Sequence, residues 1–190
     1  MSGASTQPSD VARELTSAVV RPPSHARPPA AAGFYAWWCR SDHLSDAEPP
    51  FPLEQRPPVD LAWSLLYVGI SPSSASSSRN IAARYAKDHV GGNIGGSTFR
   101  QSLAAMLMES LQLRPRPGSD RSRLVSEVPL SRWIADCCGM TFARVDRPWE
   151  LERDVIALMN PPLNLSGATH PFAADVSERR RALRSACVVG

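Results

Sequence analysis

The sequence predicts a mixed α/β fold with a small sheet. Short segments rich in aromatic and β-branched residues, which are typical of strands, alternate with segments whose apolar residues recur at helical spacing. Prolines and glycines separate these segments, as expected for turns and loops. A chain of 190 residues is long enough to form one compact domain of this kind with its own core.

Three segments are predicted as strands. Residues 33–39 are aromatic and begin at a glycine, residues 61–70 are largely apolar, and residues 140–145 follow a helical segment. We expect the first two strands to pair as a hairpin that carries a proline-rich surface loop at 40–60 between them.

The helical segments are marked by capping residues as well as by periodicity. Ser97 is a good N-cap for one helix, and Pro148 suits the first position of another. Asp10 is expected to cap a short helix near the N-terminus. The predicted helices span residues 11–20, 80–88, 98–113, 130–138, 149–159 and 175–186.

These elements divide the chain into three parts. Residues 1–30 are expected to form an N-terminal arm, because proline pairs follow the short helix. Residues 31–165 form the predicted domain. Residues 166–190 form a basic C-terminal extension whose helix is rich in arginine.

Composition excludes some classes of protein. No apolar run approaches the roughly 20 residues that a membrane helix needs, and the polar N-terminus lacks a secretory signal, so we expect a cytoplasmic protein. The net charge of +3 does not by itself indicate nucleic acid. Lys87 is the only lysine, and the many arginines suit phosphate, although a coding bias explains the same pattern.

The cysteines show no metal-binding or disulfide pattern. No C-x-x-C pair occurs, and no histidine stands at zinc-ligand spacing from them. We expect reduced thiols, with neither a disulfide framework nor a structural zinc. The four cysteines are Cys39, Cys137, Cys138 and Cys187.

Two tripeptides on the first two predicted strands carry a family resemblance. Gly33-Phe34-Tyr35 and Tyr67-Val68-Gly69 resemble the two signature tripeptides of the GIY-YIG nucleases. The gap between them is longer than is usual in that family, and the proline-rich loop accounts for the difference. The resemblance implies a small, mostly antiparallel three-stranded sheet flanked by helices.

Downstream residues extend the resemblance to residues 33–165. Arg84 lies on the helix after the second tripeptide, within the pattern Ile81-Ala-Ala-Arg84-Tyr85. Glu152 lies on a later helix and is followed by Pro161-Pro-Leu-Asn164. Glu150 faces another side of a regular helix, and Arg79 lies in the serine-rich loop, so Glu152 and Arg84 are preferred.

The resemblance implies phosphodiester hydrolysis at a one-carboxylate metal site. Glu152 would bind Mg²⁺ or Mn²⁺, since a hard cation takes oxygen ligands and keeps most of its waters. Arg84 would hold the scissile phosphate through two-pronged donation. Tyr35 and Tyr67 would face the metal, and which of them helps to activate water stays open. Asn164 would close the site by hydrogen bonds.

A role for His89 also stays open. Several family members carry a histidine or tyrosine four residues after the arginine, a position that Asp88 occupies in this chain. On a regular helix His89 lies about 140° away from the face of Arg84. It reaches the site only if the helix ends or bends before Gly91.

Five residues are candidates for binding the nucleic-acid backbone. A glycine-rich turn leads into the helix that begins with Ser97, Thr98 and Arg100, and backbone N–H groups at such a terminus suit phosphate. Ordinary helix capping explains the same residues. Arg180 and Arg181 on the last helix could bind phosphates, or form a solvated face.

The sequence therefore predicts a metal-dependent endonuclease acting on DNA. Because the chain has room only for short arms, we expect single-stranded or branched DNA as substrate, a partner protein, or a homodimer. Two alternatives remain: a nucleic-acid-binding module on the same fold that does not cut, and an unrelated small α/β protein. In the latter case Tyr35, Tyr67, Arg84 and Glu152 would lie apart.

Overall fold

The sheet has three strands and is antiparallel throughout. The computed structural model describes residues 6–53, 61–119 and 121–188. Strand β1 (Gly33–Arg40) lies in the middle, between β2 (Trp63–Ser71) and β3 (Cys138–Arg144), in the order β2-β1-β3. This arrangement confirms the predicted fold class and the predicted pairing of the first two strands.

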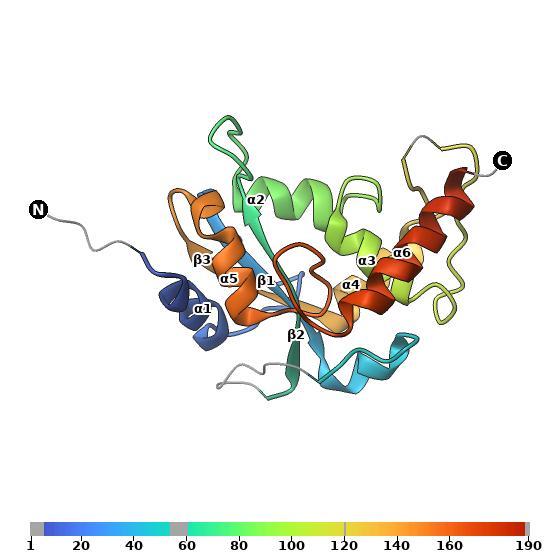
Figure 1. The fold of residues 1–190 in the computed structure, drawn as a ribbon, viewed down its shortest axis with the longest axis horizontal. Coiled ribbons are helices and arrows are strands. Elements are labelled where there is room, and N and C mark those ends of the chain that lie inside the picture. Colours follow the sequence, from blue (N-terminus) through green and yellow to red (C-terminus); the bar gives the residue numbers. More distant parts are fainter. Residues whose placement is uncertain (1–5, 54–60, 120, 189–190) are drawn as a thin grey trace, which may run out of the picture.

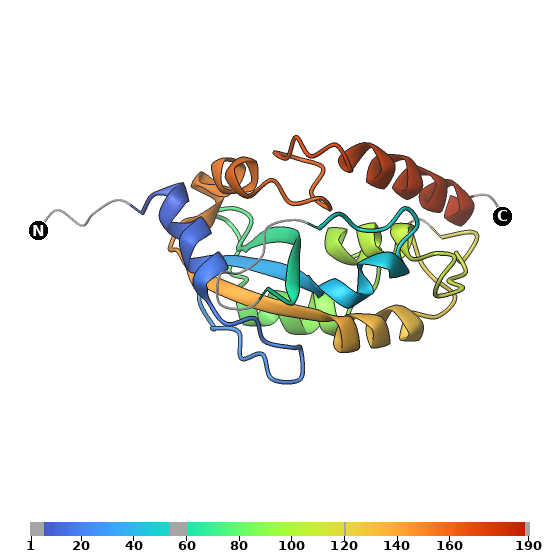
Figure 2. The ribbon, with the colours of Figure 1, turned by 90° about the horizontal axis from the view of Figure 1, so that it is seen from below.

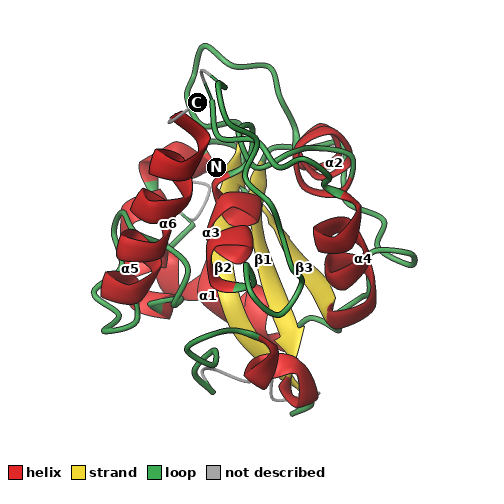
Figure 3. Cartoon of the chain, turned by 90° about the vertical axis from the view of Figure 1, so that its right-hand side faces the viewer, coloured by secondary structure: helices red, strands yellow, loops and turns green. Residues whose placement is uncertain are grey.

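Helices cover both faces of the sheet (Figure 3). Seven of the eight residues of β1 are buried, so this strand serves two apolar clusters. Tyr35 and Trp37 belong to the cluster formed with α3 (Thr98–Met106), α4 (Val128–Cys137) and α6 (Ala173–Val188). Phe34, Ala36 and Trp38 belong to the other cluster, because side chains alternate between the two faces along a strand.

The second cluster is formed with α1 (Pro8–Ser17) and α5 (Glu152–Met159). Val11 and Leu15 of α1 are buried in it. The described part of the predicted arm therefore packs onto the sheet, although α1 and α6 lie at opposite ends of the molecule (Figures 1 and 2). The boundaries of the three predicted parts stay a prediction.

The N-terminal helix begins earlier than predicted. Gln7 occupies the N-cap position, and Asp10, predicted as the cap, is the third residue of the helix. The Asp10 carboxylate accepts a hydrogen bond from the Gln7 backbone N–H, which completes a capping box. Residues 1–5 of the predicted arm and residues 54–60 of the proline-rich loop lie outside the described residues.

Two predicted helices are interrupted. Helix α3 ends at Met106 rather than at residue 113. The segment predicted as one helix from Pro148 is a 3₁₀ turn, η3 (Pro148–Glu150), followed by α5, so Glu152 begins a helix of its own. A further 3₁₀ helix, η1 (Ser41–Asp46), follows β1.

A π-helix follows the second strand. The short α2 (Ile81–Arg84) continues directly into η2 (Tyr85–Val90), where the backbone N–H of Gly91 donates to Ala86 O, five residues earlier. Among the described residues, no helix combines the length and the apolar character that crossing a bilayer requires.

Candidate active site

A cavity of about 180 Å³ brings four of the predicted catalytic residues together. Tyr35 comes from β1, Tyr67 from β2, Arg84 from α2 and Glu152 from α5. An adjoining hollow of about 330 Å³ shares Tyr67, Thr98 and Glu152 with it. The other residues that line the two spaces are Ile70, Ser71, Ser73, Ser77, Arg79, Thr98, Ile156, Leu163, Asn164, Leu165, Ser166 and Arg180.

The two tyrosines lie on the same face of neighbouring strands. Tyr35 stands opposite Gly69, and Tyr67 stands opposite Trp37, which is two residues from Tyr35. A Cβ atom at Gly69 would lie 2.5 Å from Tyr35 Oη. The glycine of the second tripeptide is therefore required, because the ring of Tyr35 lies directly over it.

The hydroxyl of Tyr35 is held by two nitrogen atoms. Arg84 Nε donates to Tyr35 Oη over 3.4 Å, and His89 Nε2 lies 2.9 Å from the same oxygen. Burial, with the neighbouring Tyr67, raises the pKa of Tyr35 above its usual range despite the opposing effect of Arg84. The phenol is therefore neutral at any ordinary pH.

The π-helix η2 explains how His89 reaches this site. In a π-helix the hydrogen bonds join residues five apart, so His89 returns to the side of Arg84. A regular α-helix would direct His89 about 140° away from Arg84, and the π-helix is the departure from regular geometry that His89 needs to reach the site. His89 is fully buried, and its Nδ1 lies 2.9 Å from Ser97 Oγ.

The imidazole of His89 is neutral. Burial, followed by the charges of Arg84 and Arg100, lowers the pKa of His89 well below its usual value. Because one ring nitrogen hydrogen-bonds to Tyr35 and the other to Ser97, the orientation of the imidazole is fixed. His89 orients Tyr35 rather than carrying charge into the cavity.

Asp88 links the two arginines of the site. Its buried carboxylate accepts from Arg84 Nη1 over 2.9 Å and also from Arg79 Nη1. From the sequence, Arg79 was expected only as a rival to Arg84, and no role was predicted for Asp88. The signal for Asp88 was its i,i+4 spacing from Arg84, a common ion-pair geometry on helices.

Glu152 is half-buried at the cavity and carries a perturbed carboxyl group. Burial raises the pKa of Glu152, although the charge of Arg84 acts in the opposite direction. Glu150 lies in η3 and pairs with Arg147 at the surface. The sequence-based preference for Glu152 over Glu150 thus agrees with which carboxylate lines the cavity.

The donor set suits a hard divalent cation. Thr98 and the two tyrosines, which carry hydroxyl groups, line the same cavity as Glu152. The buried Ser71 Oγ, which belongs to a residue lining the same cavity, has no hydrogen-bond partner among the described residues. Mg²⁺ and Mn²⁺ favour such oxygen ligands, and a cation beside Glu152 would offset the cost of burying its charge.

Asn164 acts on the strand that carries Tyr67. Its Nδ2 donates to Val68 O over 2.8 Å, and its Oδ1 accepts from Val68 N over 2.9 Å. Because β2 is an edge strand, this amide takes the place of a neighbouring strand. Asn164 is thus a positioning residue for β2, and it makes no hydrogen bond to Glu152.

The five predicted backbone-binding residues are separated by burial. Thr98 is exposed and its Oγ1 lies 2.9 Å from Tyr67 Oη, while Arg181 is exposed on α6 and Arg180 is half-buried beside the hollow. Ser97 and Arg100 are buried, contrary to their predicted contact with nucleic acid. Ser97 Oγ accepts from the Arg100 backbone N–H and caps α3.

The guanidinium of Arg100 is used inside the protein. Its Nη1 donates to His89 O over 2.8 Å, and its Nη2 donates to Glu127 Oε2 over 2.8 Å and to Ser131 Oγ over 2.9 Å. A buried charge needs such partners. Arg100 therefore connects η2 to α4 through hydrogen bonds, one of which is to the backbone of His89.

A family model decides which family these features represent. The model of the GIY-YIG catalytic domain matches residues 33–186, which is most of the chain. The chain belongs to the GIY-YIG family. Membership implies a nuclease-type activity on nucleic acid with the help of a divalent metal ion. Neither the curated proteins nor the solved structures gave a match.

Proposed function

We propose that this GIY-YIG domain is a metal-dependent endonuclease that hydrolyses phosphodiester bonds in DNA. The observation that carries the proposal is the convergence of Tyr35, Tyr67, Arg84 and Glu152 on one polar cavity from four separate elements. A chance match of short motifs would have no reason to bring these side chains together.

Glu152 is the proposed ligand of Mg²⁺ or Mn²⁺. When bound, such an ion polarises the phosphate, favours deprotonation of water and stabilises the departing oxygen. Glu152 is the one carboxylate among the residues that line the cavity. Its partial burial strengthens attraction to a cation, because fewer waters compete for the carboxylate.

Arg84 is the proposed phosphate-binding residue. Tyr35 and Asp88 fix its Nε and Nη1, respectively, while its Nη2 makes no hydrogen bond with the described residues. A guanidinium held in this way needs little reorganisation when negative charge builds up at phosphorus. Asp88 is a positioning residue in this proposal, because it acts through Arg84.

Tyr35 is proposed to orient the attacking water as a neutral phenol. Burial disfavours a phenolate at Tyr35 and an imidazolium at His89, so neither group is suited to take up a full charge. Held between Arg84 and His89, the hydroxyl instead offers a fixed hydrogen-bonding direction. Tyr67, held by Thr98, is proposed to steer the phosphate or the metal-bound waters.

The proposed substrate is DNA, with single-stranded or branched DNA ahead of regular duplex. A partner protein or a second copy of the chain could supply further binding surface. The cleavage assay therefore includes all three forms of DNA, with an RNA of matching sequence.

The test compares Glu152→Gln with the unaltered protein in the presence of Mg²⁺ or Mn²⁺. We expect cleavage to fall about 1,000-fold, equivalent to about 4 kcal/mol of transition-state stabilisation. Glu150→Gln is the matched control, because that exposed carboxylate pairs with Arg147 outside the cavity. Cleavage that survives Glu152→Gln would contradict the proposed metal ligand.

A binding module without cutting activity gives a different result. In that case the unaltered protein binds DNA in a mobility-shift assay but leaves every substrate intact with either metal ion. Glu152→Gln would then change neither binding nor cleavage. The same pair of proteins therefore separates the two functions.

A further inference from the structure

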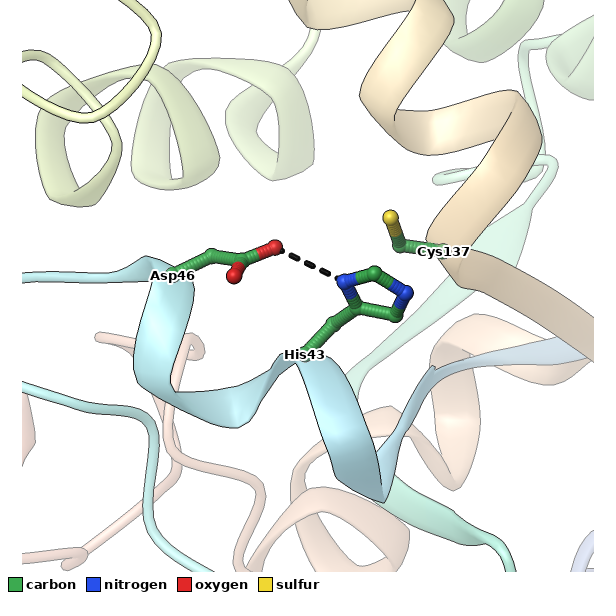
Figure 4. A group of neighbouring side chains, drawn as sticks. All are labelled: His43, Asp46 and Cys137. Atoms are coloured by element: carbon green, nitrogen blue, oxygen red, sulfur yellow. Dashed lines mark hydrogen bonds and ion pairs between the residues drawn. The ribbon is translucent and has the colours of Figure 1, made fainter.

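A second group of metal-binding side chains lies outside the active site. His43 and Asp46 come from η1, and Cys137 is the last residue of α4 (Figure 4). One ligand atom from each lies within 4.8 Å of the other two. His43 Nδ1 is 3.0 Å from Asp46 Oδ2.

This group is well separated from the catalytic cavity. Tyr35 lies near the start of β1, whereas η1 begins directly after Arg40 at the other end of that strand. At about 3.3 Å per residue, the five steps from Tyr35 to Arg40 span roughly 17 Å. An ion at His43 would therefore not take part in phosphodiester chemistry.

We propose that His43, Asp46 and Cys137 form a binding site for a thiophilic divalent ion, with Zn²⁺ the best fit. Zinc accepts nitrogen, oxygen and sulfur ligands together in tetrahedral sites. A thiolate ligand selects against Mg²⁺ and Ca²⁺, which favour oxygen. The site is thus chemically distinct from the oxygen-rich surroundings of Glu152.

The observed geometry is close to what zinc requires. Two ligand atoms bound at 2.0–2.1 Å to a tetrahedral ion lie roughly 3.3 Å apart. The separation between His43 Nδ1 and Asp46 Oδ2 is 3.0 Å. The Cys137 sulfur lies within 4.8 Å of the other two ligand atoms, so it would have to move closer to bind the same ion.

Neighbouring residues support the ligands and leave one side open. Trp133 Nε1 donates to Asp46 Oδ2 over 2.8 Å, which is the kind of outer contact that orients a metal-binding carboxylate. The His43 and Asp46 side chains are 35% and 33% exposed, so water can complete the coordination. Cys137, in contrast, is buried.

Zinc at this position would connect two segments that are far apart in sequence. It would tie η1, which follows the central strand, to the junction between α4 and β3. Without an ion, the described residues that donate hydrogen bonds to the Asp46 carboxylate are His43 and Trp133. The site would therefore add stability to a preformed loop rather than fold it.

The test uses the full chain, stripped of metal and titrated with Co²⁺ as a spectroscopic substitute for Zn²⁺. We expect one Co²⁺ per chain with a thiolate-to-cobalt absorption band that Zn²⁺ displaces and Mg²⁺ does not. At about a hundredfold excess over its Kd, Zn²⁺ should raise Tm by about 5 °C or more. Glu152→Gln should keep both signals, which separates this site from the proposed catalytic one.

Variants identify the ligands. Cys137→Ser and Asp46→Asn should each weaken Co²⁺ binding at least about 100-fold, and Cys137→Ser should abolish the thiolate band. Cys187→Ser is the matched control for losing a buried thiol elsewhere. If Cys137→Ser fails to fold, the partly exposed Asp46→Asn still decides the outcome.

Three results would overturn the proposal. One is the absence of a thiolate band in the unaltered protein. Another is a band that persists in Cys137→Ser, which would place the thiolate at another cysteine such as Cys39. The third is equal loss of binding in Cys187→Ser, which would show that binding follows general thiol content.

Discussion

The two sides of the catalytic cavity differ in how far their polar groups are already engaged. On the side of β1 and η2, which we term the closed wall, Tyr35, Arg84, Asp88 and His89 bond to one another and are largely buried. Such a network is rigid, because each group limits the movement of the next. Its geometry exists before any ligand arrives.

The opposite side, the open wall, is formed by Thr98, Glu152 and Arg180. Thr98 is exposed, and Glu152 and Arg180 are half-buried. Thr98 and Glu152 line both the cavity and the adjoining hollow, whereas Arg180 lines the hollow alone. Arg180 Nη1 reaches Ser102 Oγ over 3.4 Å and its Nη2 donates to Gln101 Oε1, yet the residue is only half-buried and still lines the hollow. The open wall is thus available to a metal ion and to the substrate backbone.

The contrast assigns different consequences to substitutions on the two walls. Changes in the closed wall should lower kcat, because they disturb groups arranged for the transition state. Changes at Arg180 on the open wall should mainly alter binding and its dependence on salt.

Arg84→Lys should lower kcat about 100-fold, because lysine cannot keep contacts to Tyr35 and Asp88 while binding phosphate in two-pronged fashion. Steady-state cleavage of one DNA substrate measures the effect. Arg181→Lys, on the exposed part of α6, is the matched control and should stay close to unaltered activity. Equal loss in both variants would contradict the special position of Arg84.

Tyr35→Phe should lower kcat roughly 10- to 50-fold, the scale of one positioned hydrogen bond in a buried site. Tyr67→Phe should cost less, since its hydroxyl bonds to the exposed Thr98 on the open wall. Because the pKa of Tyr35 is raised, the activity of the unaltered protein should show no limb from phenol ionisation below about pH 10. A basic limb that disappears in Tyr35→Phe would indicate a phenolate base instead.

The part of the site that lies on β1 and β2 could be predicted from the sequence. Because side chains point alternately to the two faces of a strand, the pairing of the strands fixes the face on which Tyr35 and Tyr67 lie, and Gly69 is needed where the Tyr35 ring covers the neighbouring strand. Glu152 was identified through the spacing to Asn164. These features depend on short-range patterns, which a single sequence displays.

The part of the site that lies on helices was harder to predict from the sequence. The change from α to π hydrogen bonding at η2 moves His89 into the site, and only the glycines after it gave a signal. A Cβ at Gly92 would lie 2.2 Å from Asp88 O, so a glycine is required there. The burial of Arg100 depends on Glu127, a distant partner that spacing does not reveal.

The same limit applies to the proposed zinc site. Its ligands come from η1 and from the end of α4, which lie far apart in the sequence. The sequence-based expectation of no structural zinc relied on the short spacings of familiar zinc motifs. A site assembled by packing between distant segments has no such spacing.

Arg180→Gln should weaken DNA binding about 10-fold at low salt with little change in kcat, because it removes one phosphate contact from the open wall. The plot of log K against log salt concentration should become shallower by about 1. Arg179→Gln, one position away on α6, is the control for general loss of charge. An unchanged salt slope in Arg180→Gln would remove this residue from the binding surface.

His89→Gln tests the closed wall through stability, with the smallest expected effect. His89 has a lowered pKa when folded, so the unfolded chain binds the proton first, at a pKa of about 6.5. The stabilisation from its neutral form is therefore present above pH 6.5 and is lost as pH falls below that value. Between pH 7.5 and 5.5 the unaltered protein should lose about 1 kcal/mol more unfolding free energy than His89→Gln. Urea unfolding at both pH values measures this difference in unfolding free energy.

His25→Gln is the control, because His25 is exposed, and it should behave as the unaltered protein does. Parallel losses in the unaltered protein and His89→Gln would mean that His89 is not held neutral by the closed wall.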